Sequence, residues 1–228
     1  NKLKDARARL QKLTSGPTPS PEALLFLARI DMREGNESAY VKSLQAALSA
    51  APNSLDARLQ LMRYYLVKNQ AKTALTYTKD GDQYGLKSPV YLDLKGKIQI
   101  AVGEPSAAVT TYQKLLQLAP KAPKAHMGMA TAQGAAGNLK AVRDELAAAL
   151  KLDPNSPEAL TQMAMLEAST GNIAAARKHT GALQSHYPKS PAGFALEGDI
   201  LLGQNKPVEA AKLYDKAFAL APSGSTAL

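Results

Sequence analysis

Small and apolar residues recur along this chain at intervals of 34 positions. Counting from Pro21 gives six units, 21–54, 55–88, 89–122, 123–156, 157–190 and 191–224, and a residue's position within its unit is called its place. The eighth place holds Ala28, Met62, Gly96, Ala130, Ala164 and Gly198; the twentieth holds Tyr40, Ala74, Ala108, Val142, Ala176 and Ala210; and the seventh holds Leu27, Leu61, Met129 and Met163 in four units. A fixed period of this length predicts an array of helical repeats, not a single globular core.

Two series of prolines follow the same period and indicate where helices begin and end. Pro21, Pro89, Pro123, Pro157 and Pro191 share one place, and Pro52, Pro120, Pro154, Pro188 and Pro222 share another. A serine precedes the first series at Ser20, Ser88, Ser156 and Ser190. Serine accepts hydrogen bonds from first-turn amides, and proline there gives up no needed donor, so a first helix begins at this place.

Glycines near the middle of four units predict a turn between two helices. Gly35, Gly103, Gly137 and Gly171 lie about fourteen residues after the first proline place. Glycine tolerates the left-handed conformation that ends many helices. The second helix follows this turn and ends before the late proline, because proline cannot continue a helix.

These features resemble the tetratricopeptide (TPR) repeat, a 34-residue helix–turn–helix unit with small residues at the eighth and twentieth places. The resemblance covers nearly the whole chain and implies an all-α, right-handed superhelical solenoid of six full units forming one continuous domain. One departure is that the aromatic residue common early in the first helix is mostly replaced. That place holds Leu24, Arg58, Leu92, His126, Leu160 and Phe194, and the chain has no tryptophan.

Both ends of the chain suggest a piece of a longer protein. Ala6, Leu10 and Leu13 fall where a second helix has its twentieth, twenty-fourth and twenty-seventh residues, so residues 1–20 are expected to hold the second helix of a truncated repeat. Residues 225–228 form a tail, and the segment from Ser223 is too short for the polar capping helix that usually closes such an array. No initiator methionine or signal segment is present.

Composition favours binding over catalysis. The chain has no cysteine, which excludes a disulfide framework, a cysteine-ligated zinc site and a thiol nucleophile. Its three histidines, His126, His179 and His186, form no metal-binding motif, and His126 occupies a place that packs between helices in similar repeats. We therefore expect no enzyme activity, no cofactor and no metal. A net charge of +9 makes acidic molecules and nucleic acid candidate partners. The simpler interpretation is a solvated surface that carries charges of both signs.

The resemblance implies where a partner binds. In similar TPR arrays the second, fifth, ninth and twelfth places line a concave groove. The ninth place reads Arg29, Arg63 and Lys97 in three consecutive units, with Arg33 one turn beyond Arg29. Apolar residues surround this column, namely Leu25, Met32, Leu59, Leu66 and Ile100. We expect a protein or peptide segment with acidic and apolar residues to bind there, because arginine donates two hydrogen bonds at once to a carboxylate.

An alternative is that these cations only pair with the nearby acidic residues Glu22, Asp56 and Asp93, as exposed ion pairs commonly do. A chaperone-tail receptor is not expected, because the asparagines of that terminal-carboxylate groove are missing.

The second unit is irregular. It has Met62 at the small eighth place and Leu86 instead of the late proline, and Asp80-Gly81-Asp82 should end its second helix early because glycine and aspartate are poor interior residues. It also gathers four tyrosines, Tyr64, Tyr65, Tyr77 and Tyr84. This unit is either a hinge or an aromatic contact patch for a sugar or peptide, or Tyr65 and Tyr77 only fill a poorly packed junction.

A narrower resemblance concerns the pathway. The run Ser190-Pro191-Ala192-Gly193-Phe194-Ala195-Leu196-Glu197-Gly198-Asp199, with Tyr91-Leu92-Asp93-Leu94-Lys95-Gly96-Lys97, is similar to units of the TPR lipoproteins of bacterial PEP-CTERM/exosortase systems. This implies a periplasmic scaffold for exopolysaccharide or protein sorting and export, with an outer-membrane lipid anchor supplied by a missing N-terminal segment.

Other interpretations stay open. A cytoplasmic location is the alternative to the periplasm, and this part of the chain is expected to make no membrane contact itself. A targeting arm of an enzyme such as a glycosyltransferase and an RNA-binding helical array are the rival functions, although nucleic acid is disfavoured because the ninth place changes from basic to acidic along the chain. The sequence does not predict an oligomeric state.

Overall fold

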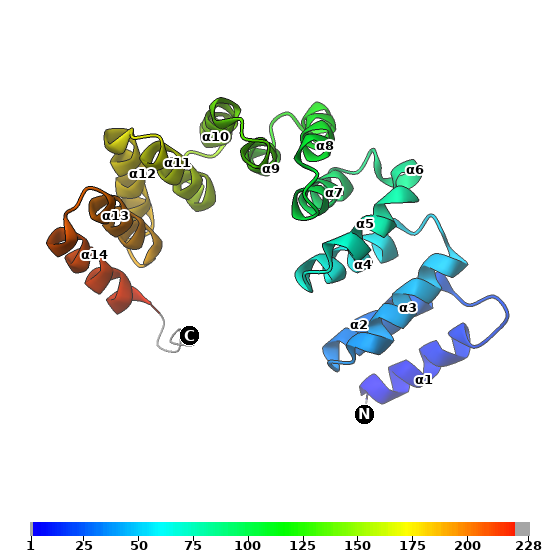
Figure 1. Ribbon diagram of the computed structural model, residues 1–228. Coiled ribbons are helices and arrows are strands. Elements are labelled where there is room, and N and C mark those ends of the chain that lie inside the picture. The colour runs from blue at the N-terminus through cyan, green and yellow to red at the C-terminus, as the bar shows by residue number, and fades with distance from the viewer. Residues whose placement is uncertain (1, 222–228) are drawn as a thin grey trace. The chain divides into compact units, whose positions relative to one another are not determined.

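The structure, a computed structural model, describes residues 2–221, and those residues form fourteen helices and no strand (Figure 1). The helices are α1 (Lys2–Thr14), α2 (Pro21–Arg33), α3 (Glu37–Ala50), α4 (Leu55–Val67), α5 (Ala71–Lys79), α6 (Asp82–Gly85), α7 (Pro89–Ala101), α8 (Pro105–Leu118), α9 (Pro123–Ala135), α10 (Leu139–Leu152), α11 (Pro157–Ser169), α12 (Ile173–His186), α13 (Ala192–Gly203) and α14 (Pro207–Leu220). The tail expected at 225–228 lies outside the described residues.

The helices begin close to the places predicted for them. Ser20, Ser88 and Ser156 each accept a hydrogen bond from the backbone amide three residues later, as helix-capping serines do. Ser54 caps α4 in the same way, although no proline follows it. The prediction at Ser190 is off by one residue, because Pro191 itself takes the capping position and α13 begins at Ala192.

The turns within the repeats use two residue types. Gly35, Gly103, Gly137 and Gly171 have positive φ angles between 74° and 82°, which confirms the predicted glycine turns. The second and sixth units have Asn69 and Asn205 at this position, with φ angles of 56° and 59°. Asparagine is the residue after glycine that best tolerates this conformation, so every full unit turns in the same way.

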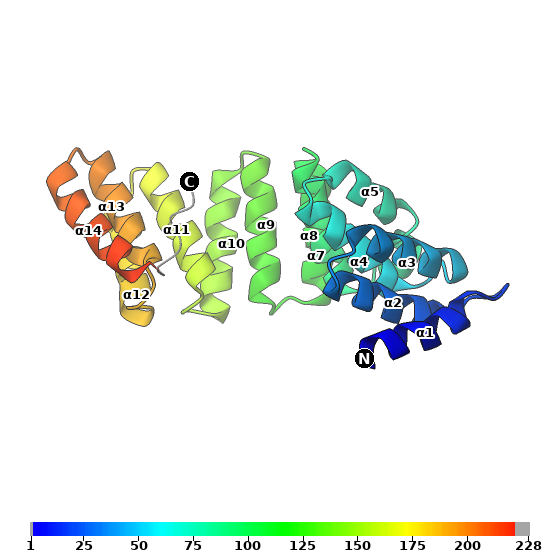
Figure 2. The same cartoon turned by 90° about the horizontal axis from the view of Figure 1, so that it is seen from below.

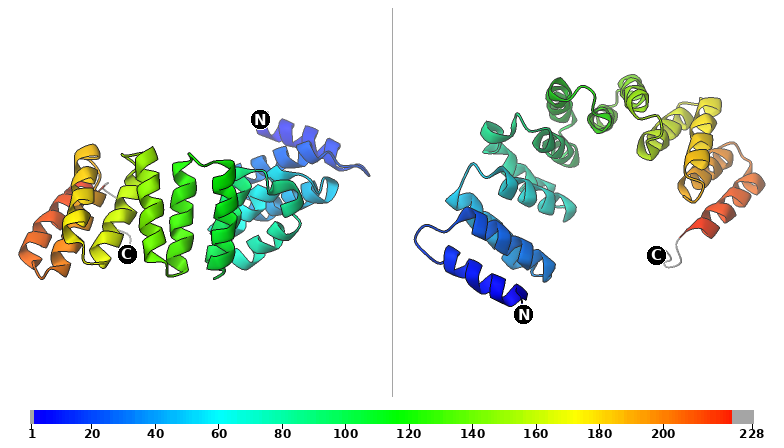
Figure 3. Two further views of the ribbon diagram at one scale, coloured as in Figure 1. Left: turned by 90° about the horizontal axis from the view of Figure 1, so that it is seen from above. Right: turned by 180° about the vertical axis from the view of Figure 1, so that it is seen from behind.

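The chain divides into two compact units, Asn1–Leu118 and Ala119–Leu228. Within the first, each of the pairs α2–α3, α4–α5 and α7–α8 packs as a hairpin; the second contains the pairs α9–α10, α11–α12 and α13–α14. Figures 2 and 3 show the two helices of a pair lying side by side, most clearly for α9 and α10. In both compact units the helices in contact belong to the same repeat or to neighbouring repeats.

The core follows the small places of the repeat. Ala28, Ala130 and Ala164 at the eighth place are buried, as are Ala74 and Ala176 at the twentieth. Glycine replaces alanine at the eighth place where a tyrosine occupies the twenty-fourth. A Cβ atom on Gly96 would lie 2.5 Å from the ring of Tyr112, and one on Gly198 would lie 2.8 Å from that of Tyr214. The larger ring therefore requires the smaller partner.

The second helix of the irregular unit ends early, as predicted. α5 ends at Lys79, and the short α6 follows after Gly81. The buried Arg58 donates hydrogen bonds to the carbonyls of Tyr77 and Pro52, at 3.1 and 2.8 Å. The Tyr91 hydroxyl donates to the carbonyl of Thr78 at 2.9 Å, so side chains replace the helical partners that the Tyr77 and Thr78 carbonyls lack at the end of α5.

Candidate functional site

A cavity of about 550 Å³ lies in the first compact unit, between α2, α3 and α4. It is lined by Arg29, Met32, Glu37, Tyr40, Asp56, Gln60, Arg63, Tyr64, Val67 and Lys68. The structure therefore brings together three of the residues predicted for the groove, namely Arg29, Met32 and Arg63. We call this the α2–α4 cavity.

One acidic residue of the cavity is neutralised by its neighbours. Lys68 Nζ lies 2.6 Å from Glu37 Oε1, and the Tyr64 hydroxyl donates to Glu37 Oε2 at 3.0 Å. The hydrogen bond from Lys68, followed by that from Tyr64, lowers the pKa of Glu37 below its ordinary value. Glu37 is therefore a carboxylate with its charge already compensated, and Lys68 is not available as a free cation.

The opposite wall holds a second acid. Gln60 Nε2 donates to Asp56 Oδ1 at 3.1 Å, and Arg29 Nη2 lies 3.9 Å from Asp56 Oδ2, the outer limit of an ion pair. The guanidinium of Arg29 also lies 5.3 Å from the centre of the Phe26 ring. Arg29 is thus loosely held, because exposed ion pairs contribute little and are screened by salt.

Arg63 is the cation of this cavity without a partner. Among residues 2–221 it forms no ion pair and no side-chain hydrogen bond, and it is exposed at the rim. Tyr40 and Tyr64 flank it with their rings 5.5 Å apart, and Met32 and Val67 expose apolar surface beside it. The geometry combines an unpaired guanidinium with aromatic and aliphatic walls.

The other predicted groove residues lie elsewhere. Leu25 lines a small neighbouring cavity of about 170 Å³ with Glu22, Phe26 and Arg29. Lys97 pairs with Asp93 at 2.7 Å, one helical turn away. The remaining residues, Arg33, Leu59, Leu66 and Ile100, do not line the α2–α4 cavity; Arg33 is exposed and the three apolar side chains are partly buried.

The alternative that the ninth-place cations only pair with nearby acidic residues holds for some of them. Asp93 does pair with Lys97, whereas Asp56 reaches Arg29 of the preceding repeat, not Arg63 of its own. Glu22 accepts a hydrogen bond from the Ser20 hydroxyl at 3.0 Å.

The tyrosines of the irregular unit divide between packing and cavity wall. Tyr65 and Tyr77 stack with ring centres 5.8 Å apart and pack against the buried core of the first two repeats. Tyr64 lies 5.3 Å from Tyr65 and faces the cavity on its other side. A continuous aromatic row thus joins the core to the cavity.

Sequence reasoning missed Glu37, Tyr40, Gln60, Val67 and Lys68 in this cavity. The second helix α3 contributes Glu37 and Tyr40, but the prediction considered only first helices. Val67 is 74% exposed in the structure, and nothing in the sequence pattern marked it as exposed.

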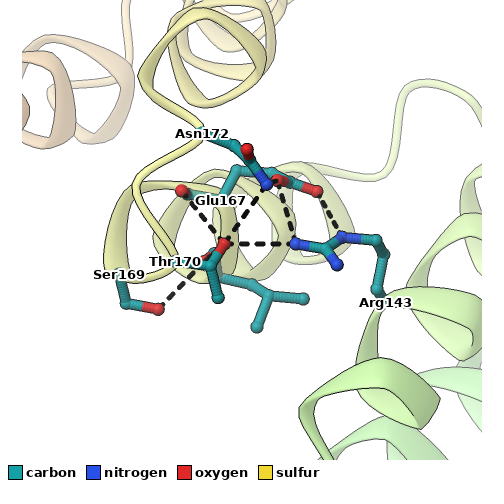
Figure 4. A network of polar contacts seen from close by, with 6 residues as sticks. Arg143, Glu167, Ser169, Thr170 and Asn172 are labelled. Atoms are coloured by element: carbon teal, nitrogen blue, oxygen red, sulfur yellow. Dashed lines mark hydrogen bonds and ion pairs between the residues drawn. The ribbon is translucent and has the colours of Figure 1, made fainter.

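A polar network lies in the second compact unit, at the junction of α10 and α11. Figure 4 shows the guanidinium of Arg143 facing the carboxylate of Glu167, with Thr170 and Asn172 beside it. Arg143 donates through Nε at 2.8 Å and Nη2 at 3.2 Å, and Asn172 donates to the same carboxylate at 2.8 Å. The hydrogen bonds from Arg143 are the main cause that lowers the pKa of Glu167, opposed by burial.

Two of the three histidines, His126 and His179, are partly buried, and His186 is exposed. His126 Nδ1 lies 2.7 Å from Glu145 Oε2, and its Nε2 lies 3.1 Å from the carbonyl of Pro120. Burial is the main cause that lowers the pKa of His179. Within residues 2–221 no cluster of three or more metal-ligating side chains occurs, and no helix there is both long and apolar enough to span a bilayer.

Comparison with known proteins gives the family. The family model described as "Tetratricopeptide repeat" matches residues 94–157 and 161–225, more than half of the chain. A comparison with curated protein sequences finds no match.

Solved structures share the fold. A tetratricopeptide repeat protein from Parabacteroides merdae superposes with a TM-score of 0.77 at 19% identity, over 97% of this chain and 86% of that one. PilW, a type IV pilus biogenesis factor, gives 0.76 at 17% identity, over 90% and 95% of the two chains. YrrB, a TPR protein with an unusual peptide-binding site, gives 0.56 at 16% identity, over 81% and 95%.

Proposed function

Because the chain belongs to the tetratricopeptide repeat family, we propose that it is a non-catalytic protein-binding scaffold whose α2–α4 cavity takes an extended partner segment with acidic and apolar side chains. The observation that carries this proposal is the unpaired guanidinium of Arg63 between the tyrosine wall and the exposed Met32 and Val67. A carboxylate would pair with Arg63, and an adjacent apolar side chain would cover the two aliphatic residues.

The three cations at the ninth place are expected to contribute unequally to the affinity for the partner. Arg63 is expected to contribute most, Arg29 less because it already approaches Asp56, and Lys97 least because Asp93 compensates its charge at 2.7 Å. Reversing one charge at Arg63 should therefore weaken binding nearly as much as reversing all three.

The test uses the full-length protein as bait in extracts of its native cells. Proteins retained by the wild type but lost with Arg63→Glu are the expected partners, and each is then measured by titration with purified protein. Arg33→Glu is the matched control, because it reverses an exposed arginine of the same compact unit outside the cavity. Equal binding by the wild type and both variants would rule out this site.

We propose further that the scaffold works in a bacterial envelope, in exopolysaccharide or protein sorting or export. This rests on the similarity of two of its repeats to the TPR lipoproteins of PEP-CTERM systems. PilW, named as a type IV pilus biogenesis factor, also has this fold, although its 17% identity carries the fold alone. Fractionation of cells with an epitope-tagged full-length protein tests the location; recovery in the cytosol would contradict it.

A further inference from the structure

A second cavity, of about 560 Å³, lies in the second compact unit between α12, α13 and α14. Arg177, Lys178 and Gly181 of α12 line one side, and the partly exposed Leu213 lines the other, above the buried Leu201. It shares no residue with the α2–α4 cavity. We call it the α12–α14 cavity.

The cavity is open because α12 has a glycine in its interior. A Cβ atom on Gly181 would have no heavy atom within 4 Å, so space is left where a side chain would otherwise stand. The same place holds a longer residue in four of the other units, Gln45, Lys79, Gln113 and Asp215, and alanine in one, Ala147. A helix-interior glycine lowers helix stability without filling this space.

Arg177 is fixed at the edge of this space by one of its three nitrogens. Its Nε donates to Glu197 Oε1 at 2.6 Å, and the buried Glu197 also accepts a hydrogen bond from the Thr180 hydroxyl. Within residues 2–221, Nη1 and Nη2 of Arg177 form no hydrogen bond. The guanidinium is therefore oriented but keeps two donors unused, and its side chain is 51% exposed.

One other unit has an arginine at this place, and that arginine has fewer unused donors. Arg143, at the same place, uses both Nε and Nη2 on the following unit's eleventh-place Glu167 and a further bond on Thr170. In the sixth unit the eleventh place is Leu201, and the acid stands one helical turn earlier as Glu197. With this shift, Arg177 bonds Glu197 through Nε alone, and neither terminal nitrogen forms a hydrogen bond within residues 2–221.

We propose that the α12–α14 cavity is a docking site for a partner polypeptide, which inserts an acidic side chain flanked by an aliphatic one. The charges favour this occupant, because Arg177 and Lys178 are two cations against the single carboxylate of Glu197, and Lys178 forms no ion pair within the described residues. The carboxylate pairs with Nη1 and Nη2 of Arg177, and the aliphatic group contacts the partly exposed Leu213. This site is independent of the function proposed for the α2–α4 cavity.

The probe is a synthetic peptide, acetyl-Ser-Leu-Glu-Leu-Ser-amide, titrated into the ¹⁵N-labelled full chain and followed by NMR. The expected result is a set of amide shifts at Lys178, Gly181 and Leu201. The same peptide with Gln in place of Glu should bind about tenfold more weakly, because it loses the charge-assisted pair. A third peptide has Gln in place of Glu and a free C-terminal carboxylate, so its negative charge lies at the chain end. If it binds as tightly as the Glu peptide, the site does not require an acidic side chain, and the proposal is overturned.

Variants at Gly181 separate docking from folding. Gly181→Leu fills the cavity with no atom to displace, so the Glu peptide should bind at least about tenfold more weakly while the melting curve stays at or above that of the wild type. Gly181→Ala adds one methyl group and should retain binding within about twofold. Arg177→Lys keeps the charge near Glu197 but loses the planar fork, and should weaken binding about fivefold.

Three outcomes would overturn the proposal: equal shifts with the Glu and Gln peptides, unchanged affinity in Gly181→Leu, or shifts confined to α2–α4. Arg63→Glu is the control for the other cavity and should leave the affinity for the peptide at α12–α14 unchanged. Experiments that contradict peptide binding at the α12–α14 cavity therefore differ from those that contradict partner binding at the α2–α4 cavity.

Discussion

At the scale of single residues, the residue at one place of the repeat depends on the side chain that packs against it. A small residue at the eighth place was predictable from the period alone, but the reason for glycine at Gly96 and Gly198 lies in Tyr112 and Tyr214, which pack against them. The sequence also contained Lys97 and Asp93 four residues apart, a spacing that pairs on helices, and the structure pairs them. The Glu37–Lys68 pair was not predictable, because it depends on how α3 packs beside α4.

Gly96→Ala should destabilise the protein by about 1–3 kcal/mol, because its methyl group would lie 2.5 Å from the buried Tyr112 ring. The matched control is Gly181→Ala, the same change in a helix interior with open space around it, which should stabilise by about 0.5–1 kcal/mol. Urea unfolding followed by circular dichroism measures both. Destabilisation of similar size in both variants would show that the ring contact is not the cause.

The buried Glu167 should make stability depend on pH. Its pKa is lowered in the folded protein, mainly by the hydrogen bonds from Arg143, so its contribution is present above the unfolded pKa of about 4.3 and is lost as the pH falls through the lower folded pKa. Glu167→Gln should cost about 1 kcal/mol or more at pH 7, and the difference from the wild type should shrink below about pH 4. Unfolding at a series of pH values measures this; a difference that does not change with pH contradicts it.

At the scale of helices, caps and turns explain most of what the sequence predicted. The serine–proline pairs located the first helices, with a shift of one residue at α13. The glycines located four turns, but Asn69 and Asn205 were missed because asparagine in a left-handed conformation is less diagnostic than glycine. The early end of α5 was predictable from Asp80 and Gly81. The role of Arg58, which satisfies carbonyls around that break, depends on tertiary packing and was not.

Two first helices, α9 and α13, lack a side-chain cap, and α9 should accept one. Ala122 is the capping residue of α9, with the extended φ and ψ of −93° and 108° that capping serines also adopt, but it offers no acceptor. Ala122→Ser should therefore stabilise the protein by about 1 kcal/mol, and Ser156→Ala, which removes the equivalent cap of α11, should cost about as much. Thermal unfolding measures both variants. No gain from Ala122→Ser would mean that its geometry cannot support the bond.

At the scale of the whole molecule, contacts within each compact unit join a repeat to the one beside it. Arg7–Asp31 joins α1 to the first unit at 2.8 Å, and Arg143–Glu167 joins the fourth unit to the fifth. The neighbour-to-neighbour plan and the all-α fold followed from the period. The residues of the α2–α4 cavity were predictable from the sequence only in part, because the cavity depends on which side chains of a second helix reach the first helices beside it.

Such an array should respond locally to damage. Arg143→Ala leaves the carboxylate of Glu167 buried without its partner and should cost about 1–3 kcal/mol. Hydrogen exchange should become faster in α10, α11 and α12, while α2 to α5 keep the protection of the wild type. Uniformly faster exchange across all helices would show that the chain unfolds as a single cooperative body instead.

The junction ion pairs also restrict the order in which the repeats can follow one another. Val41 stands at the place where Arg143 stands in the fourth unit, and it packs in an apolar cluster. A recombinant chain that joined the first unit directly to the fifth would put this valine opposite Glu167. The carboxylate would keep its hydrogen bond from Asn172 but lose its arginine, at a cost of about 1–3 kcal/mol, so units of equal length are still not interchangeable.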